Sequence, residues 1–571
     1  MYTNRLRGYL RVSALLLAAL LFPLRGFSQS GARAAGNDGP TASGDSQPTT
    51  LTLLHELEAM KERIAALEAE VRRLKAEESA RATAPSVPAT IVGASRSSGI
   101  VAVRDPAVAA AASDLAAATP ATANTTAGPT AAATEPESYE PAKQSKEEPF
   151  NFADFSWLTG NSRQKDYPLA TKYFTPEVRV DVNYTEDFNH PSDDTIGGSS
   201  EIFRSNEFQL TQLGIGGDLH VDNVRGRLLT QFGMYSQTQP RNDASPARGQ
   251  WDLDGAYRYL AEAYGGYHFD VLHGVNVDAG IFMSYIGLFS FYNYDNWAYQ
   301  PSYVSSNTPW FFNGVRIQIF PSKKLKIEPW FINGWQSYGQ FNKRPGLGGQ
   351  ILWRPTNSVS IVGNQYGIGR DTLGAQYRTR WHTDDSIQVK YYDVPDNWMD
   401  KSAFTVTIDA GCESGSGVAC FGNGKNGAKK QSFLGFMVYD RLWFHRDLFA
   451  FTVGGGAIDN PGRYLVLLPP INGATAVSGT PYFTENPGDP FKAWDVSGTF
   501  DYMPSQFVTF RWEFNHRASN VPYFSGPGGI TPPGGNQGPL GSEVFLPSGA
   551  PWTPDLRKYE NRATFAIMVK F

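Results

Sequence analysis

Alternating apolar and polar residues dominate the chain from Phe150 onward. Near the start of this region, Val178, Val180 and Val182 are each separated by a polar residue. Successive side chains of a strand point to opposite faces, so this period of two predicts strands with one apolar and one polar face. The segments that we interpret as strands are 176–186, 203–219, 223–236, 255–269, 275–287, 310–320, 324–337, 346–354, 358–367, 372–383, 385–394, 430–444, 447–458, 492–503, 506–517 and 558–571.

The connections between these segments alternate in length. Short turns are predicted near Val221, Leu272, Ser322, Thr356, Asp384, His445 and Ser505. The other connections are mostly longer, above all 395–429, 459–491 and 518–557, with 368–371 as the exception. Tight periplasmic turns and long external loops are typical of an outer-membrane barrel with an even number of strands, about sixteen here. A strand-like segment at 401–409 would make the number odd, so we place it in an external loop.

The last segment ends on Phe571 and shows the alternation clearly. Its two faces carry Tyr559, Ala563, Phe565, Ile567, Val569 and Phe571 on one side and Lys558, Glu560, Arg562, Thr564 and Lys570 on the other. A sheet in lipid must close because unpaired backbone groups are costly there, so we expect this strand to pair with the first one near Val178. C-terminal aromatic strands of this kind resemble the signal read by the outer-membrane insertion machinery, and Phe571 is the expected signal residue.

The polar faces of the strands should line the inside of an all-β, antiparallel transmembrane barrel. The candidate pore-lining residues are Arg179, Asp181, Arg316, Arg378, Arg380, Lys390, Arg511 and Glu513. A barrel of about sixteen strands is wide enough for a water-filled pore, and charged rings set the selectivity of such pores. A modest excess of inward arginine would favour anions. Equally, these charges could pair across neighbouring strands and stiffen the wall.

The chain before residue 150 has a different character. Arg5, Arg7 and Arg11 precede a short apolar run, which predicts a secretory signal over 1–28, too short to span a bilayer. A linker is assigned to 29–50. The segment 79–149 is rich in Ala, Thr, Pro and Ser and predicts a disordered tether. The aromatic residues that follow, from Phe150 onward, are expected to pack against the barrel wall, with plugging or bracing as the alternative.

Between the two linkers, 51–78 has the spacing of a coiled coil. Its expected core residues, in a repeat of four and three, are Leu53, Leu57, Met60, Ile64, Leu67, Val71 and Leu74. A lone amphipathic helix packed on a domain would show a similar pattern, but the strict heptad favours self-association. We expect this segment in the periplasm, where it would hold a homo-oligomer together or bind the cell wall.

Composition narrows the class of protein further. The net charge is −5 and no basic block is present, which argues against nucleic acid as a partner. The mean hydropathy of −0.35 resembles that of a soluble protein, but polar lumen-facing residues dilute the hydropathy of any barrel. Cys412 and Cys420 lie close together in an exported chain, so a disulfide is expected. A metal site is the weaker alternative, because no histidine accompanies these cysteines.

Enzymatic chemistry has little support in the sequence. The eight histidines are scattered, and none has a metal-binding spacing. His190, which lies near Asp193 and Asp194, and His516 are the candidates for a hydrolase site at a barrel rim, but a loop histidine beside acids is usually simple surface. We therefore expect no enzymatic activity, no cofactor and no resident metal.

Several motifs between Gly280 and Gly369 carry a family resemblance. They are Gly280-Ile281-Phe282, Tyr294-Asp295-Asn296-Trp297 with Tyr299, Thr308-Pro309-Trp310-Phe311, Asn313-Gly314-Val315-Arg316 and Asn333-Gly334-Trp335, followed later by Arg511-Trp512-Glu513-Phe514 and Val521-Pro522-Tyr523-Phe524. With the strand pattern, these motifs resemble the OmpL-like β-barrel porin-2 family over 150–571. The resemblance implies an outer-membrane porin, names no solute and transfers no catalytic residue.

The sequence thus favours a passive diffusion pore for small hydrophilic solutes or ions in the bacterial outer membrane, in contact with its lipid. The rival hypothesis is a structural anchor, in which the coiled coil tethers the barrel to the cell wall or to an oligomer. A barrel enzyme ranks last.

Overall fold

The structure is a computed structural model that describes residues 148–571. The residues 198, 200, 241–242, 244–248, 307, 341–343, 368–376, 421–426, 463–487 and 532–551 are outside this description. The chain divides into two units, Met1–Ala131 and Ala132–Phe571, and the first lies entirely outside the described residues. The signal, both linkers up to residue 147 and the coiled coil with its core from Leu53 to Leu74 therefore remain predictions.

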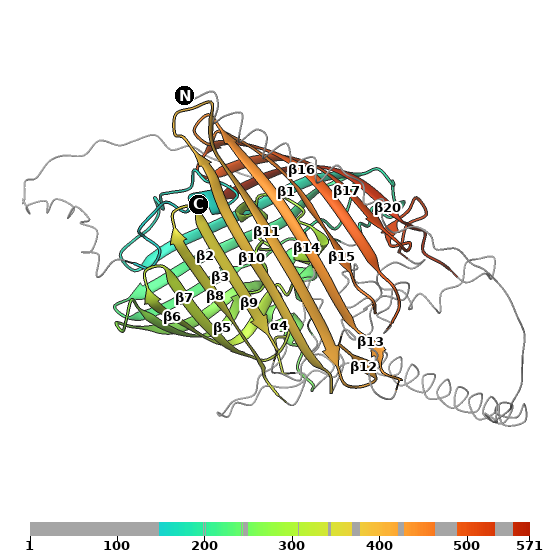
Figure 1. Cartoon of the computed structure of the whole chain (residues 1–571), viewed down its shortest axis with the longest axis horizontal. Coiled ribbons are helices and arrows are strands. Elements are labelled where there is room, and N and C mark those ends of the chain that lie inside the picture. The colour runs from blue at the N-terminus through green and yellow to red at the C-terminus, as the bar shows by residue number, and fades with distance from the viewer. Residues whose placement is uncertain are drawn as a thin grey trace, which may run out of the picture. The chain divides into compact units, whose positions relative to one another are not determined.

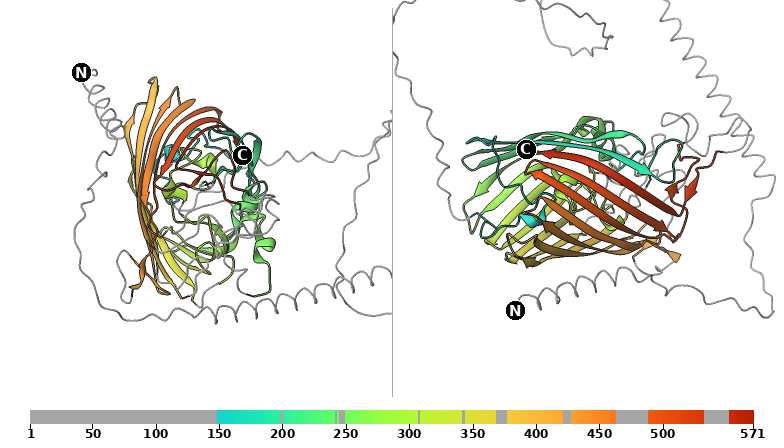
Figure 2. Two further views of the ribbon diagram at one scale, coloured as in Figure 1. Left: turned by 90° about the vertical axis from the view of Figure 1, so that its right-hand side faces the viewer. Right: turned by 90° about the horizontal axis from the view of Figure 1, so that it is seen from above.

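A closed antiparallel barrel of sixteen strands forms the second unit (Figure 1). In chain order the barrel strands are β1 (Phe174–Asp187), β2 (Phe208–Val221), β3 (Val224–Thr230), β4 (Leu260–Phe269), β5 (Val275–Met283), β6 (Phe311–Ser322), β7 (Leu325–Ile332), β8 (Gly346–Thr356), β9 (Val359–Tyr366), β10 (Thr379–Asp393), β11 (Met399–Ser414), β14 (Ser432–Phe444), β15 (Phe449–Asp459), β16 (Lys492–Ser505), β17 (Val508–Ser519) and β20 (Tyr559–Lys570). Each pairs with its neighbour in sequence, and β20 pairs with β1. Figure 2 shows the strands curving around an interior that contains further chain.

The predicted alternation decides which side chains face inward. In β1, Arg179, Asp181 and Asn183 are buried, whereas the valines between them lie on the outer face. On β17 the inward Arg511 is fully buried and the outward Trp512 is 44% exposed. An outer wall of exposed apolar side chains suits contact with lipid, which confirms the predicted arrangement of the faces.

The predicted closure is also confirmed. Arg179 of β1 lies opposite Lys570 of β20. Phe571 extends this seam, because its N–H donates to Val178 O (3.0 Å) and its ring stacks on Phe507. Closure satisfies the edges that an open sheet would expose to lipid.

Two predictions between residues 372 and 409 are wrong. Instead of two strands with a turn at Asp384, a single strand β10 runs through that position. The segment that we placed in an external loop, Lys401–Asp409, forms most of β11, and Asp384 lies directly opposite Asp409. An acidic pair such as Asp384 and Asp385 is typical of turns, but an inward polar side chain is equally compatible with a barrel strand.

This correction makes the alternation of connection lengths complete. The turn after β10 is residues 394–398, and the connection before β10 becomes residues 367–378 in place of a short link. Every second connection is now short and the others are all longer. The barrel therefore has the predicted number of strands, but the strands between residues 372 and 409 are not the predicted ones.

Short elements occupy the connections. They are η1 (Ser156–Leu158) before the barrel, α3 (Tyr235–Thr238) and α4 (Leu253–Tyr257) between β3 and β4, and η4 (Asn293–Asp295) and α5 (Tyr303–Ser306) between β5 and β6. Two small sheets, β12 (Val418–Ala419) with β13 (Lys429–Lys430) and β18 (Phe524–Ser525) with β19 (Leu556–Arg557), stand outside the barrel sheet. No helix in the described part of the chain is long and apolar enough to cross a bilayer.

A disulfide joins Cys412 of β11 to Cys420. It closes a small loop at the end of the β11 strand, with a sequence separation of 8. Cross-linking so short a loop restricts the unfolded chain, so we expect Cys412→Ser with Cys420→Ser to lower the free energy of unfolding by about 2 to 3 kcal/mol. Urea unfolding of the refolded barrel would measure this, and an unchanged midpoint would contradict it.

Candidate functional site

The connection between β5 and β6, residues 284–310, folds into the barrel and is called the inner loop below. It contains η4 and α5, and Trp297, Tyr299 and Tyr303 are buried. Trp297 packs edge-to-face on Trp443 of β14 and belongs to the same apolar cluster. Burial of large aromatic rings is a major source of packing free energy, so this loop is part of the barrel's core.

Arginines of the wall donate hydrogen bonds to backbone carbonyls of the inner loop. The bonds run from Arg511 Nη1 to Asn293 O (3.1 Å), from Arg511 Nη2 to Asn296 O (2.7 Å), from Arg441 Nη1 to Trp297 O (3.1 Å) and from Arg517 Nη2 to Pro301 O (2.9 Å). Asp501 of β16 accepts from Arg511 Nε (2.6 Å) and lies 2.8 Å from Arg441 Nη2. All three residues of this ion triad are fully buried. The charge-assisted bonds fix the loop against β14, β16 and β17.

Carboxylates of the wall accept hydrogen bonds from the same loop. Glu513 accepts from the backbone N–H groups of Tyr299 (2.6 Å) and Gln300 (2.9 Å). Asp495 accepts from Ser302 Oγ (2.8 Å) and from the N–H of Tyr303 (3.0 Å), and Asp181 accepts from Asn293 Nδ2 and Tyr299 Oη. The inner loop is therefore hydrogen-bonded to both acidic and basic side chains of the wall. These bonds hold it in one position.

Asp295 of η4 connects the inner loop to the barrel seam. Its carboxylate contacts Arg179 Nη1 at 2.8 Å and Lys570 Nζ at 3.1 Å. Burial alone would raise the pKa of Asp295, but the guanidinium and ammonium groups outweigh it and the pKa is lowered. Asp295 is therefore ionised at neutral pH and keeps both ion pairs.

The inner faces of β1 to β7 carry a second set of charges, which we call the charged belt. It consists of Glu177, Asp218, Arg225, Arg227, Glu262, Asp278, Arg316, Lys326 and Glu328. Arg227 is its centre: its guanidinium nitrogens lie 2.8 Å from Glu177, 2.9 Å from Asp218 and 3.0 Å from Glu262. Arg225 and Arg316 both contact Asp278, and Lys326 contacts Glu328. Acidic and basic side chains are thus interspersed and paired on these seven strands.

Water reaches parts of the charged belt. The side chains of Asp218 and Arg225 are 50% and 29% exposed, whereas Asp278 is fully buried. Arg316 lies against the stacked rings of Tyr264 and Phe282, with its guanidinium carbon 4.5 and 4.6 Å from the two ring centres. Stacking and ion pairing hold the charges in fixed positions facing the interior.

The predicted pore-lining residues fall into three groups. Arg179, Asp181, Arg511 and Glu513 contact the inner loop, whereas Arg316 belongs to the charged belt. The remaining bases lie on β10 or just before it: Arg378 and Arg380 contact Glu413 at 2.9 and 2.7 Å, and Lys390 contacts Asp393 at 2.5 Å. Arg316, Arg380 and Arg511 pair with acids on a neighbouring strand, whereas a pore-lining role for these residues stays a prediction.

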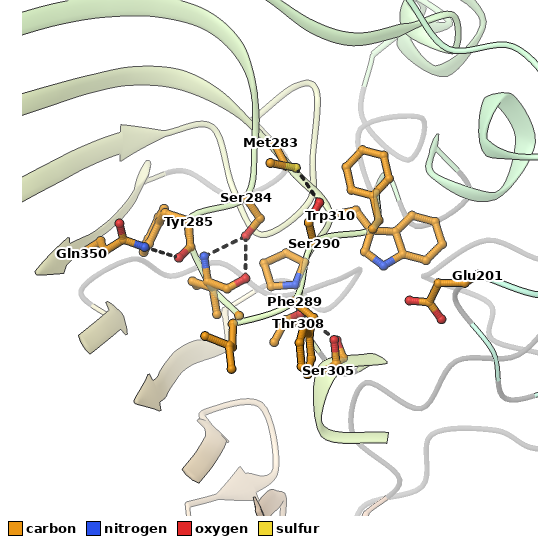
Figure 3. Close-up of a pocket in the computed structure, with 15 residues that line it drawn as sticks. Glu201, Met283, Ser284, Tyr285, Phe289, Ser290, Ser305, Thr308, Trp310 and Gln350 are labelled. Atoms are coloured by element: carbon orange, nitrogen blue, oxygen red, sulfur yellow. Dashed lines mark hydrogen bonds between the residues drawn. The ribbon is translucent and has the colours of Figure 1, made fainter. Parts of the chain in front are cut away.

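A pocket of about 140 Å³ lies at the base of the inner loop (Figure 3). Glu201 and Trp310 lie at one end of it, and Gln350 and Tyr285 at the other, where Gln350 Nε2 donates to Tyr285 O (2.8 Å). At roughly 30 Å³ for each water in the liquid, the pocket holds only a few water molecules. A cavity of similar volume can also accept one small molecule of about the size of benzene.

The histidines considered for hydrolysis lie apart from the interior. His190 is exposed in the connection after β1 and contacts Glu186 at 3.3 Å. His516 lies on the outer face of β17, where its ring packs on Trp494 and its Nδ1 is 2.7 Å from Asn561 Oδ1. Within the described ranges, no three His, Cys, Asp or Glu side chains form a group that could hold a metal ion.

Neither the inward fold of the inner loop nor most of the charged belt follows from the sequence pattern. The inner loop was treated as an external connection, although its Tyr294-Asp295-Asn296-Trp297 motif carried the family resemblance. An unusual density of Tyr, Trp and Asn in a long connection was the available signal, since exposed loops are usually richer in Gly, Pro and Ser. Of the belt, Arg316 alone was among the candidates.

Known proteins resemble this chain at two levels. A family model described as "Putative beta-barrel porin-2, OmpL-like" matches residues 175–544, which is more than half of the chain. No curated protein matches it in sequence.

Several solved outer-membrane proteins resemble it in structure. OmpT of Vibrio cholerae is 8% identical with a TM-score of 0.38, covering 71% of this chain and 99% of its own. The outer membrane channel DcaP of Acinetobacter baumannii is 14% identical with a TM-score of 0.38 (70% and 99% covered). An anion-selective porin from Comamonas acidovorans is 7% identical with a TM-score of 0.40 (70% and 99% covered). At these scores the likenesses support no argument about function.

Proposed function

Because this chain belongs to the OmpL-like β-barrel porin-2 family, we propose that it forms a passive diffusion pore for small hydrophilic solutes or ions. Its family and its closed barrel indicate the bacterial outer membrane as its location. Transmembrane barrels of this kind place short turns in the periplasm and longer loops outside. The N-terminal segment would then lie on the periplasmic side.

One observation carries the proposal: the inner loop is fixed to β1 and to β14–β17, and the charged belt on β1–β7 meets the loop where Tyr292 Oη donates to Glu262 (3.1 Å). Arg179 joins the two, because its guanidinium contacts Glu177 next to the belt's centre and Asp295 of the loop. We propose that solutes pass between the inner loop and the belt. Fixed charges of both signs beside water would let polar solutes pass and exclude apolar ones.

Planar-bilayer recording of the purified full chain tests this function. We expect stepwise increases of current in KCl as single barrels insert, and swelling of liposomes that contain the protein when small sugars are added outside. Barrels that insert, as judged by protease protection of the reconstituted strands, and yet pass no current would contradict the proposal.

Arg227 should control ion selectivity. Arg227→Gln would leave Glu177, Asp218 and Glu262 facing the path without their shared cation, so the pore should become more permeable to cations. The reversal potential in a KCl gradient would then shift towards the cation value. Arg446→Gln is the matched control, because this turn arginine is 82% exposed and pairs with the exposed Asp396. An identical reversal potential in both variants would remove Arg227 from the conduction path.

Two further roles rest on the sequence. We propose that the outer-membrane insertion machinery recognises Phe571 and the strand before it, since the Phe571 side chain is exposed at the turn end of the seam. We also propose that 51–78 forms a periplasmic coiled coil that supports a homo-oligomer. Cross-linking of the full chain and of a variant lacking 51–78 would test the second role, with loss of the oligomer in the variant as the expected result.

A further inference from the structure

The segment before β1 follows the rim of the short-turn end. We call residues 148–166 the brace. Phe150 donates its N–H to Lys323 O (2.8 Å) in the β6–β7 turn, and Trp157 Nε1 donates to Asn357 O (3.2 Å) in the β8–β9 turn. Trp157 is buried in the same apolar cluster as Trp443 of the wall. The brace therefore packs against the barrel wall, as the sequence predicted.

The second half of the brace reaches β14 to β17. Asn161 Nδ2 lies within hydrogen-bond distance of Ser505 O (3.2 Å), Val508 O (3.3 Å) and Thr509 Oγ1 (3.1 Å). Ser162 Oγ donates to Asp447 Oδ2 (2.9 Å), and Arg163 Nη1 donates to Met503 O (2.9 Å). The brace is thus fixed to the turn ends of strands from β6 to β17.

Between these two sets of contacts, the brace touches the inner loop at Gly160. The N–H of Gly160 donates to Asp295 O (2.9 Å). A Cβ at this glycine would lie 2.2 Å from Tyr294 O and 2.4 Å from Asn296 O, far inside van der Waals contact. Only glycine permits this backbone approach, so the brace and η4 are packed without a gap.

One wall residue holds both segments. Arg441 Nη2 donates to Gly160 O (2.8 Å), and Arg441 Nη1 donates to Trp297 O (3.1 Å). Arg441 is fully buried and forms an ion pair with Asp501. The brace, the inner loop and the wall therefore meet at a single guanidinium group.

We propose that the brace positions the inner loop and so keeps the pore at one width, with Gly160 and Asn161 as the positioning residues. Asp295, the loop residue that Gly160 contacts, is also the partner of Arg179 and Lys570 at the edge of the proposed path. Displacement of the brace would remove one support of this end of the loop, which Arg511 and Arg179 of the wall also hold. The bonds to Glu513 and Asp495 would keep the other end in place. This inference rests on the proposed pore where its test measures current, but not where its test measures hydrogen exchange.

The test compares Gly160→Ala and Asn161→Ala with wild type in the full chain. Gly160→Ala forces brace and loop apart, and Asn161→Ala deletes the bonds to the turns without adding an atom. We expect both variants to show stepwise fluctuations of the open-channel current where wild type holds one level. Hydrogen exchange of the backbone amides of Asp295 and Asn296 should be at least several-fold faster in both variants.

Two control variants match the changes. Gly498→Ala adds the same methyl group at a β16 glycine where nothing lies within 4 Å, and Lys165→Ala truncates an exposed brace side chain. Both should behave as wild type. A steady current and unchanged exchange in Gly160→Ala and Asn161→Ala would overturn the inference. If Gly160→Ala does not fold, Asn161→Ala alone decides. If wild type passes no current but hydrogen exchange is faster in the variants, the proposed pore is refuted and the positioning role of the brace is supported.

Discussion

Asp501→Ala should be the most destabilising single substitution in the barrel. It would leave Arg441 and Arg511 fully buried without the carboxylate that both contact. Removing one partner of a buried ion pair typically costs about 3 to 5 kcal/mol, because the remaining charge stays desolvated. The same carboxylate also orients the two guanidinium groups that bind the inner loop, so the loss should spread beyond one strand.

Urea unfolding into and out of lipid vesicles would measure this effect. Asp459→Ala is the matched control, because Asp459 is 56% exposed and pairs with Lys492, which is 61% exposed. Such exposed pairs contribute about 0 to 1 kcal/mol. Equal unfolding midpoints for the two variants would show that the triad around Asp501 is solvated and does not support the loop.

Removal of the inner loop should produce the largest change in conductance. Replacing residues 289–308 with a short Gly-Ser linker would take out η4, α5 and the aromatic side chains that fill the space beside β14–β17. The single-channel conductance should then rise several-fold, since water would occupy that space. Arg511, Arg517, Glu513 and Asp495 would lose their loop partners and face the enlarged path, so ion selectivity should change as well.

Single-channel recording in KCl would test this, with passage of larger sugars into liposomes as a second readout. Trp251→Ala is a suitable control, because Trp251 lies in another long connection and is 81% exposed. The control should keep the wild-type conductance. A loop-shortened barrel that folds and conducts as wild type does would mean that the loop does not limit the path.

The strands were predictable because burial in a barrel follows a period of two. In β1 and β17, the apolar and polar residues of the sequence alone place each side chain on the correct face. The main exception is β10, where Asp384 suggests a turn, and the predicted strands 223–236 and 255–269 also extend into α3 and α4. Local composition cannot separate a turn from an inward acidic position, since only pairing with Asp409 of β11 decides between them. Because a barrel of this kind has an even number of strands, the extra strand predicted at β10 led us to place Lys401–Asp409 in a loop.

The site was less predictable because its partners are far apart in sequence. Inward orientation of Arg179, Arg511 and Glu513 could be derived from alternation, but their contacts with the inner loop could not. The Arg511–Asn293 and Glu513–Tyr299 bonds each join residues more than two hundred positions apart. The density of Tyr, Trp and Asn could indicate which long connection folds inward, but no local pattern encodes which wall residues it contacts.

The seam between β1 and β20 also constrains how the protein can fold. These strands are the two ends of the barrel sheet, so their pairing closes the longest loop of the chain and is expected to form late. The brace precedes β1 and packs across the turn end of the finished wall, and the inner loop lies inside that wall. Their aromatic side chains would therefore have to dock while the sheet is still open. Assembly intermediates with an unpaired β20 should already protect Trp157 and Trp297 from quenchers. Quenching of tryptophan fluorescence during assembly would therefore show whether these side chains are buried before the barrel closes.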